Sequence, residues 1–184
     1  VFYGSSITQG GCASRPGNSY QALISRRFNI DYFNFGFSGN ALGEKTMADY
    51  IAALPMSLFF LDFDHNSPNA EHLKAHHESF FLKIREKNPD LPVIMATKTD
   101  IPRSPAAEKS NAAHRAVVYE TYENAVKRGD RNVIFIDGAT VFSKALTLSA
   151  PADSCTVDGC HPNDLGFACM AKVFGDAIEK MFGL

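Results

Sequence analysis

Two short segments near opposite ends of the chain carry the side-chain types that nucleophilic catalysis requires. Asp158 and His161 stand three residues apart in a loop before the last predicted helix, and Ser5 and Ser6 follow the first apolar residues. The D-x-x-H spacing allows the carboxylate to accept a hydrogen bond from one imidazole nitrogen while the other nitrogen faces outward. Ser6 would supply the hydroxyl nucleophile, so the two segments together predict a Ser-His-Asp site.

Each of these features also has an ordinary structural explanation. Gly4-Ser5-Ser6 could be a strand-to-helix turn, because serine is a common helix cap, and Asp158 could cap the helix that follows. Gly39 could simply supply a positive φ at the end of a strand, and Asn66 could be a turn former. Taken together, these separate explanations are less convincing, because all of the segments fall at one edge of the sheet that the sequence predicts.

That sheet follows from apolar runs that alternate with segments of helical periodicity. The predicted strands cover residues 1–3, 31–37, 57–61, 91–96 and 132–137. The predicted helices cover about 18–28, 47–54, 73–87, 106–128 and 167–181. One further helical turn is expected near 141–146, inside the long connection 138–160.

The alternation predicts an α/β fold, a three-layer α/β/α, flavodoxin-like doubly wound five-stranded parallel sheet in the order 2-1-3-4-5. In that order the chain reverses direction between the first and third strands, and open α/β sheets bind ligands in the crevice at such a point. Gly4-Ser5-Ser6 and Asp64-His65-Asn66 should therefore face each other across this crevice.

Length and charge narrow the function classes. The 184 residues suit one domain covering 1–184. A net charge of -2 without a Lys/Arg cluster argues against a nucleic-acid partner. No apolar run approaches the roughly 20 residues of a membrane span.

Only Val1 to Tyr3 precede Gly4, whereas a strand usually has about 5–6 residues. We therefore expect a truncated N-terminal strand and a missing N-terminal segment or domain, and cytoplasmic and secreted locations both stay open.

Cysteine and histidine spacing gives no metal signature. The four cysteines, Cys12, Cys155, Cys160 and Cys169, form no C-x-x-C pair, so a zinc site is not predicted. We expect four reduced thiols; the alternative is a bridge involving Cys155, Cys160 or Cys12. His76 and His77 are adjacent, so their side chains would point about 100° apart on a helix. No metal and no cofactor is predicted.

Four separated blocks of the chain resemble those that give the SGNH, or GDSL-like, hydrolases their name, which stands for Ser, Gly, Asn and His. The blocks are Gly4-Ser5-Ser6-Ile7-Thr8, Phe35-Gly36-Phe37-Ser38-Gly39-Asn40, Asp64-His65-Asn66 and Asp158-Gly159-Cys160-His161. They occur in the family order and span residues 4–161. The chain is also similar in these blocks to a bacterial branch of GDSL-like lipases/acylhydrolases.

The resemblance implies a role for each matching residue. Ser6 takes the nucleophile position, His161 is the general base, and Asp158 orients the imidazole. The oxyanion hole would consist of the backbone N–H groups of Ser6 and Gly39 and the side-chain amide of Asn66.

Two departures from the family pattern concern the loops around these residues. The first block usually has Asp before the nucleophile, where this chain has Ser5. The third usually reads Gly-x-Asn-Asp, whereas Asp64 and Ser67 flank this part of the chain. Neither change removes a catalytic group, so they bear on loop geometry and substrate. The candidate substrate contacts are Arg15, Asn40, Asp64 and His65.

The function that the resemblance implies is that of a serine esterase acting on carboxylic esters. Short acyl groups, such as O-acetyl groups on carbohydrates, are the leading substrate class. An acyltransferase with the same triad and a catalytically inactive carbohydrate-binding α/β module are the alternatives. A flavodoxin is not favoured, because the first loop lacks the run of hydroxyls and amides that would cradle the FMN phosphate.

Overall fold

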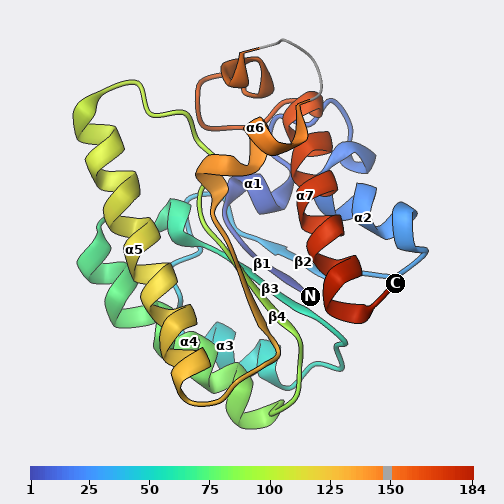
Figure 1. Ribbon diagram of the computed structural model, residues 1–184, viewed down its shortest axis with the longest axis vertical. Helices are drawn as coiled ribbons and strands as arrows, with labels where there is room; N and C mark the ends of the chain where they lie inside the picture. The colour runs from blue at the N-terminus through green and yellow to red at the C-terminus, as the bar shows by residue number, and fades with distance from the viewer. Residues whose placement is uncertain (147–150) are drawn as a thin grey trace.

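Five parallel strands form the central sheet of the computed structural model, which describes residues 1–146 and 151–184. The strands are β1 (Phe2–Gly4), β2 (Asn34–Gly36), β3 (Phe59–Asp62), β4 (Val93–Ala96) and β5 (Val133–Ile136). Their order is β2-β1-β3-β4-β5, and every neighbouring pair is parallel (Figure 1). The predicted fold class and strand order are thereby confirmed.

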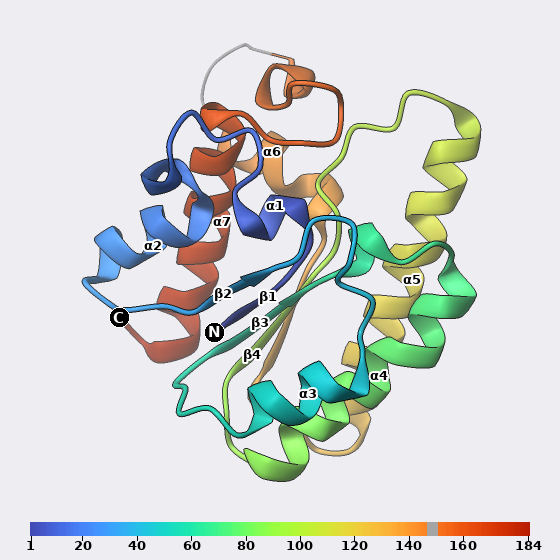
Figure 2. The ribbon, with the colours of Figure 1, turned by 180° about the vertical axis from the view of Figure 1, so that it is seen from behind.

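Helices cover both faces of this sheet (Figure 2). They are α1 (Ser6–Gln9), α2 (Tyr20–Phe28), α3 (Lys45–Ala52), α4 (Ala70–Lys87), α5 (Pro105–Lys127), α6 (Val141–Ala145) and α7 (Asp164–Phe182). Short 3-10 turns are η1 (Pro16–Asn18), η2 (Asp64–Asn66), η3 (Gly138–Thr140) and η4 (Ala152–Cys155). Helices α2, α6 and α7 lie on one face, and α3, α4 and α5 lie on the other.

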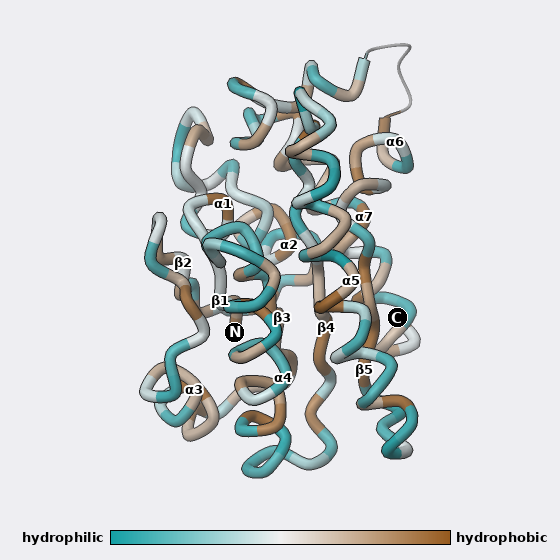
Figure 3. The backbone as a smooth tube through the Cα atoms, turned by 90° about the vertical axis from the view of Figure 1, so that its left-hand side faces the viewer, coloured by the Kyte–Doolittle hydropathy of each residue, from teal (hydrophilic) through white to brown (hydrophobic). Residues whose placement is uncertain are grey.

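The core consists of two layers that the sheet separates, because successive strand residues point to opposite faces. Tyr3 and Leu61 pair across β1 and β3 and pack toward α3 and α4. Phe2 and Phe60 pair one residue earlier, stack at 5.3 Å between ring centroids, and pack toward α7. Apolar residues accordingly colour β4 brown in Figure 3, whereas the helices show both teal and brown stretches. Both faces of the central strands are buried, as their continuous apolar runs predict.

Two predicted segments differ from the structure in extent. The expected strand 31–37 pairs only over Asn34–Gly36, because β2 is an edge strand with a single neighbour and Phe33 before it is half exposed. The connection 138–160 contains the predicted helical turn, α6, together with η3 and η4; its residues 147–150 lie outside the described residues. Among the helices in the described ranges, none is long and apolar enough to cross a membrane.

Candidate active site

A hydrogen-bonded chain of side chains joins Ser6, His161 and Asp158. Ser6 Oγ lies 3.0 Å from His161 Nε2, and His161 Nδ1 lies 2.7 Å from Asp158 Oδ2. An ionised carboxylate only accepts hydrogen bonds, so Nδ1 is assigned the hydrogen and Nε2 accepts from the Ser6 hydroxyl. The fold therefore brings together the three side chains that the sequence singled out.

The turn that carries His161 is stabilised by its own carboxylate. Asp158 Oδ1 accepts hydrogen bonds from the backbone N–H groups of Cys160, at 2.8 Å, and His161, at 2.7 Å. Gly159 between them has φ +91°, a conformation that favours glycine. The hydrogen bonds from His161 lower the pKa of Asp158 to about 2. The carboxylate is consequently ionised at neutral pH. An ionised carboxylate can stabilise the positive charge that the imidazole acquires when it gains a proton.

Ser6 is held at the tip of β1 by close packing around Gly4. A Cβ on Gly4 would lie 2.1 Å from both the backbone oxygen of Asp62 and Thr8 Oγ1. The chain can therefore turn directly from β1 into α1. Ser5 is the N-cap of α1, and its side chain accepts from the N–H of Ile7 at 3.2 Å. Ser5 is thus a buried cap, and the next residue, Ser6, presents its hydroxyl at the carboxyl edge of the sheet.

Three donors of the predicted oxyanion hole are left without partners. Asn66 Oδ1 accepts from the N–H of Ala41 at 3.1 Å, which identifies the other amide atom, Nδ2, as the one free to donate. In residues 1–146 and 151–184, the backbone N–H groups of Ser6 and Gly39 and the Asn66 Nδ2 donate no hydrogen bond. Gly39 has φ +70°, which agrees with the structural explanation that this glycine supplies a positive φ after β2.

The loop after β2 is fastened on both sides to the neighbouring site segments. The N–H of Phe37 donates to the oxygen of Gly4 at 2.8 Å, and the N–H of Ser38 donates to Gln9 Oε1 at 3.3 Å. On the other side, Ala41 bonds Asn66 as described above. The segment around Gly39 is therefore held between α1 and η2, which is where the predicted oxyanion hole requires it.

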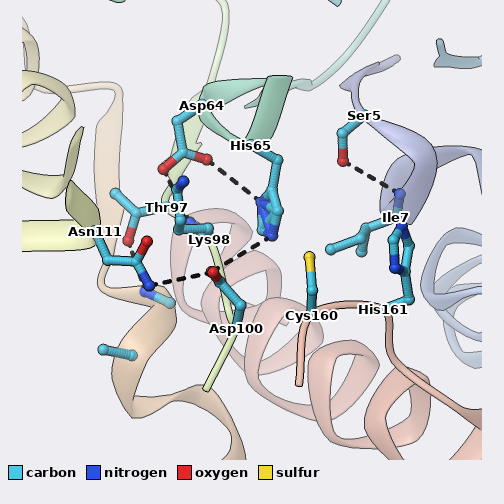
Figure 4. A network of polar contacts seen from close by, with 12 residues as sticks. Ser5, Ile7, Asp64, His65, Thr97, Lys98, Asp100, Asn111, Cys160 and His161 are labelled. Atoms are coloured by element: carbon cyan, nitrogen blue, oxygen red, sulfur yellow. Dashed lines mark hydrogen bonds and ion pairs between the residues drawn. The ribbon is translucent and has the colours of Figure 1, made fainter. Parts of the chain in front are cut away.

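The candidate substrate contacts occupy different environments. Arg15 and Asn40 are exposed. The expectation for Asp64 needs correction, because its side chain is fully buried and its Oδ2 accepts from the N–H of Lys98 at 3.0 Å. His65 is also nearly enclosed, with 7% of its side chain exposed. Figure 4 shows its ring between Asp64 and Asp100, with Cys160 between these residues and His161.

Sequence reasoning missed several residues that hold the site. Asp164, the first residue of α7, accepts from the N–H and hydroxyl of Ser14 at 2.9 and 2.6 Å and from Asn18 Nδ2 at 3.0 Å. These bonds attach the loop after α1, which carries Arg15, to the helix that follows His161. The only sequence signal was Asn163-Asp164 before an apolar helix, which indicates a helix start and says nothing of the loop.

Several cysteines and histidines outside this site pack against neighbouring side chains. All four cysteines are free, as expected; Cys155 and Cys169 are buried in contact, with their sulfur atoms 4.0 Å apart. His77 is buried and its Nδ1 lies 2.9 Å from Thr121 Oγ1, whereas the His76 ring stacks on His72, with centroids 4.1 Å apart. The two adjacent histidines diverge, as the helical geometry predicts.

Comparison with known proteins gives one family match. The model of the GDSL-like Lipase/Acylhydrolase family matches residues 1–179. No curated protein sequence matches the chain.

Solved structures share the fold. A protein from Bacteroides ovatus ATCC 8483, described as a GDSL-like lipase, is 33% identical with a TM-score of 0.86 over 99% of this chain and 52% of its own. The salicylyl-acyltransferase SsfX3 from a tetracycline biosynthetic pathway is 23% identical, with a TM-score of 0.79 over 100% of this chain and 55% of its own. A family two carbohydrate esterase from Clostridium thermocellum, in complex with cellohexaose, is 15% identical, with a TM-score of 0.73 over 99% and 63%. The chain thus spans about half the length of the first two.

Proposed function

The chain belongs to the GDSL-like lipase/acylhydrolase family, and from that premise we propose that it is a serine esterase acting on short acyl esters. The observation that carries the proposal is the chain of contacts from Ser6 through His161 to Asp158, with separations of 3.0 and 2.7 Å. A nucleophile, a base and an orienting group within hydrogen-bond reach are what acyl transfer through a covalent intermediate needs.

The proposed reaction has two steps. Ser6 Oγ attacks the acyl carbonyl carbon while His161 Nε2 takes the hydroxyl proton, and the tetrahedral intermediate expels the alcohol, which receives that proton. Water then attacks the acyl-serine, with His161 again acting as the base, and the acid leaves. Asp158 keeps the hydrogen on Nδ1 and stabilises the imidazolium. The unpaired N–H groups of Ser6 and Gly39 and the Asn66 amide would receive the developing oxyanion.

The exposure of the base supports hydrolysis over transfer to another acceptor. A third of the His161 side chain and nearly half of the Asp158 side chain are exposed, so water can approach the acyl-enzyme from this side. The fold shared with SsfX3 keeps an acyltransferase as the alternative reaction. The two are separated by product analysis in the presence of an alcohol or sugar acceptor.

The proposed substrates are short acyl esters, with O-acetyl groups on carbohydrates as the leading class. An apolar pocket of about 480 Å³ does exist, but Val1 and Leu58, at the amino ends of β1 and β3, and Ile178, near the end of α7, line it. Ser6 stands at the carboxyl end of β1, so that pocket cannot hold a long acyl chain attached to Ser6. Carbohydrate esterases among the solved structures share the fold, which supports the choice of substrate panel.

Ser6→Ala tests the proposed function directly. We expect wild-type protein to hydrolyse p-nitrophenyl acetate and to react with a fluorophosphonate probe at Ser6, and the variant to do neither. Ser5→Ala is the matched control: it removes a cap from α1 but keeps the nucleophile, so probe labelling should persist. Hydrolysis that survives in Ser6→Ala overturns the assignment, and comparison of acetyl, butyryl and octanoyl esters with acetylated oligosaccharides tests the substrate class.

A further inference from the structure

Three buried side chains at the end of β3 converge beside the candidate active site. Asp62 is the last residue of β3, and Asp64 and His65 belong to the turn η2 that follows. Each can offer one ligand atom, and these atoms all lie within 4.8 Å of one another. Asp62 and Asp64 are 4% and 0% exposed, and 7% of the His65 side chain is exposed. None of the three is used in the proposed esterase mechanism.

Each carboxylate of this cluster is oriented by hydrogen bonds to one of its two oxygens. Asp62 Oδ2 accepts from Tyr20 Oη at 3.2 Å and from Thr8 Oγ1 at 3.3 Å. Asp64 Oδ2 accepts from the N–H of Lys98 at 3.0 Å. The Oδ1 atoms accept no hydrogen bond from the described residues. This is the arrangement by which outer partners orient the ligands of a bound metal.

His65 is the unpartnered member of the cluster. Neither ring nitrogen has a hydrogen-bond partner within the described residues, although both are buried. Nδ1 lies 3.7 Å from Asp64 Oδ1, which is itself buried without a partner, and Figure 4 shows the ring directed at that oxygen. Buried polar atoms are rarely left unsatisfied. Two such atoms, His65 Nδ1 and Asp64 Oδ1, face each other, which indicates a ligand that bonds nitrogen and oxygen together; His65 Nε2 lies on the other side of the ring, 3.7 Å from Asp100 Oδ1.

We propose that Asp62, Asp64 and His65 form a binding site for one divalent cation of the zinc type. An imidazole nitrogen with two carboxylate oxygens suits zinc and its transition-metal neighbours, whereas calcium and magnesium take oxygen ligands. Three protein ligands with one open position are also common for zinc. The site uses no cysteine, which is why the cysteine spacing gave no indication of it.

The distances within the cluster allow this ligand after a small contraction. Ligand atoms about 2.0–2.2 Å from a tetrahedral zinc lie roughly 3.3–3.6 Å apart. His65 Nδ1 and Asp64 Oδ1 are 3.7 Å apart, and all three ligand atoms lie within 4.8 Å of one another, so binding would draw them closer together. A dication would bond His65 Nδ1 and Asp64 Oδ1, which are buried and have no hydrogen-bond partner within the described residues.

The cation would act on the active site through η2. Two of its three ligands lie in the turn Asp64–Asn66, whose last residue carries the candidate oxyanion-hole amide. Binding would therefore fix this turn and position Asn66 without contacting the substrate. The inference does not depend on the esterase proposal, because its primary readouts are metal binding and stability.

Zinc binding to chelator-treated protein is the direct test. We expect one zinc per chain by metal analysis after gel filtration, a saturable signal on titration with ZnCl2, and a rise in Tm that CaCl2 does not reproduce. Asp64→Asn and His65→Gln should abolish the zinc-induced rise in Tm. Tyr20→Phe keeps all three ligands but removes one of the two hydroxyls that bond Asp62, together with the contact of that hydroxyl with Thr8. We expect about 10–100-fold weaker zinc binding, typical of outer-shell changes.

His72→Gln provides the matched control, because the stacked His72–His76 pair is another place where imidazoles meet on the described chain. The control should retain one zinc and the full rise in Tm. Equal zinc binding by wild type and His65→Gln, loss of zinc in His72→Gln, or wild type without zinc would each overturn the proposal. Circular dichroism of the metal-free variants identifies any that fail to fold. If Asp64→Asn or His65→Gln fails to fold, the zinc affinity of Tyr20→Phe becomes the test, and an affinity equal to that of the wild type overturns the proposal.

Discussion

Asp158 holds His161 by two hydrogen bonds at once, one to the ring and one to the backbone. Its Oδ2 accepts from Nδ1 at 2.7 Å, and its Oδ1 accepts from the His161 N–H at 2.7 Å. The first bond sets the tautomer and ring orientation, and the second sets the course of the chain around Gly159. One carboxylate therefore has a chemical and an architectural role, and the two can be separated by mutation.

Asp158→Asn should remove the chemical role alone. The amide oxygen can still accept from the backbone, but the amide N–H groups would face Nδ1 and favour the tautomer with hydrogen on Nε2, which cannot take a proton from Ser6. We expect kcat on p-nitrophenyl acetate to fall about 10⁴-fold, as for this exchange in a known Ser-His-Asp enzyme, with Tm nearly unchanged. Asp158→Ala should lower kcat and Tm together, and an unaltered kcat in Asp158→Asn would remove Asp158 from the triad.

Asn66→Ala should lower the transition-state stabilisation without preventing acylation of Ser6. Loss of one oxyanion donor typically reduces kcat by about 10²–10³-fold, and KM should change little. Asn132→Ala is the control, because Asn132 is exposed at the amino end of β5, away from the site, and its side-chain amide donates only to the oxygen of Asp90. Steady-state kinetics of both variants decide the assignment: equal losses in the two would place the oxyanion contact elsewhere.

Gly4→Ala should destabilise the fold through steric overlap. The added methyl group would lie 2.1 Å from the Asp62 backbone oxygen, so β1 and β3 or α1 must move, at a cost of about 1–3 kcal/mol or more. Gly17→Ala is a matched control, since its methyl group would approach only Arg26 Nη1, at 3.4 Å. Urea unfolding should show a lower midpoint for Gly4→Ala and little change for Gly17→Ala; the reverse order would contradict the packing described around β1.

His77 should make stability fall on mild acidification. Burial lowers the pKa of His77 to about 3 from its usual 6.5, so the folded protein excludes a proton that the unfolded chain binds. The contribution of His77 to the free energy of unfolding is complete above pH 6.5. It is lost as the pH falls from 6.5 toward 3, where the free energy of unfolding decreases by about 1.4 kcal/mol per pH unit. His77→Gln should reduce this slope in urea unfolding measured from pH 7.5 to 4.5. Parallel curves for variant and wild type would show that His77 takes up its proton in both states.

The fold was predictable because its signals are local and repeated. Runs such as Ser57–Leu61 indicate a strand buried on both faces, and helical stripes alternate with them, so few topologies remain. The proximity of the three candidate triad residues was predictable for a related reason, since Ser6 follows a strand end and the Asp158–His161 turn precedes a helix start at the same edge of the sheet. The hydroxyl, imidazole and carboxylate that such a site needs could be recognised in the sequence before any distance was known.

Contacts between loops were not predictable in the same way. Asp64 looked like an exposed loop residue, yet the N–H of Lys98 after β4 bonds it and the sheet edge encloses it. The burial of His65 and the attachment of Ser14 to Asp164 likewise depend on how segments far apart in the chain pack. No pattern within a single segment encodes such pairings, which is why a polar residue after a strand can be either a substrate contact or an internal support.

The separation of Ser6 from His161 by 155 positions has a consequence for when the site forms and how it can be lost. During synthesis the candidate nucleophile, Ser6, emerges before its candidate base, His161, which follows 155 positions later. A nascent chain that has not yet docked α7 therefore holds a serine without a proton acceptor. The proposed hydrolytic activity would arise only after the segment that carries His161 has folded against Ser6, and proteolytic release of that segment would end it.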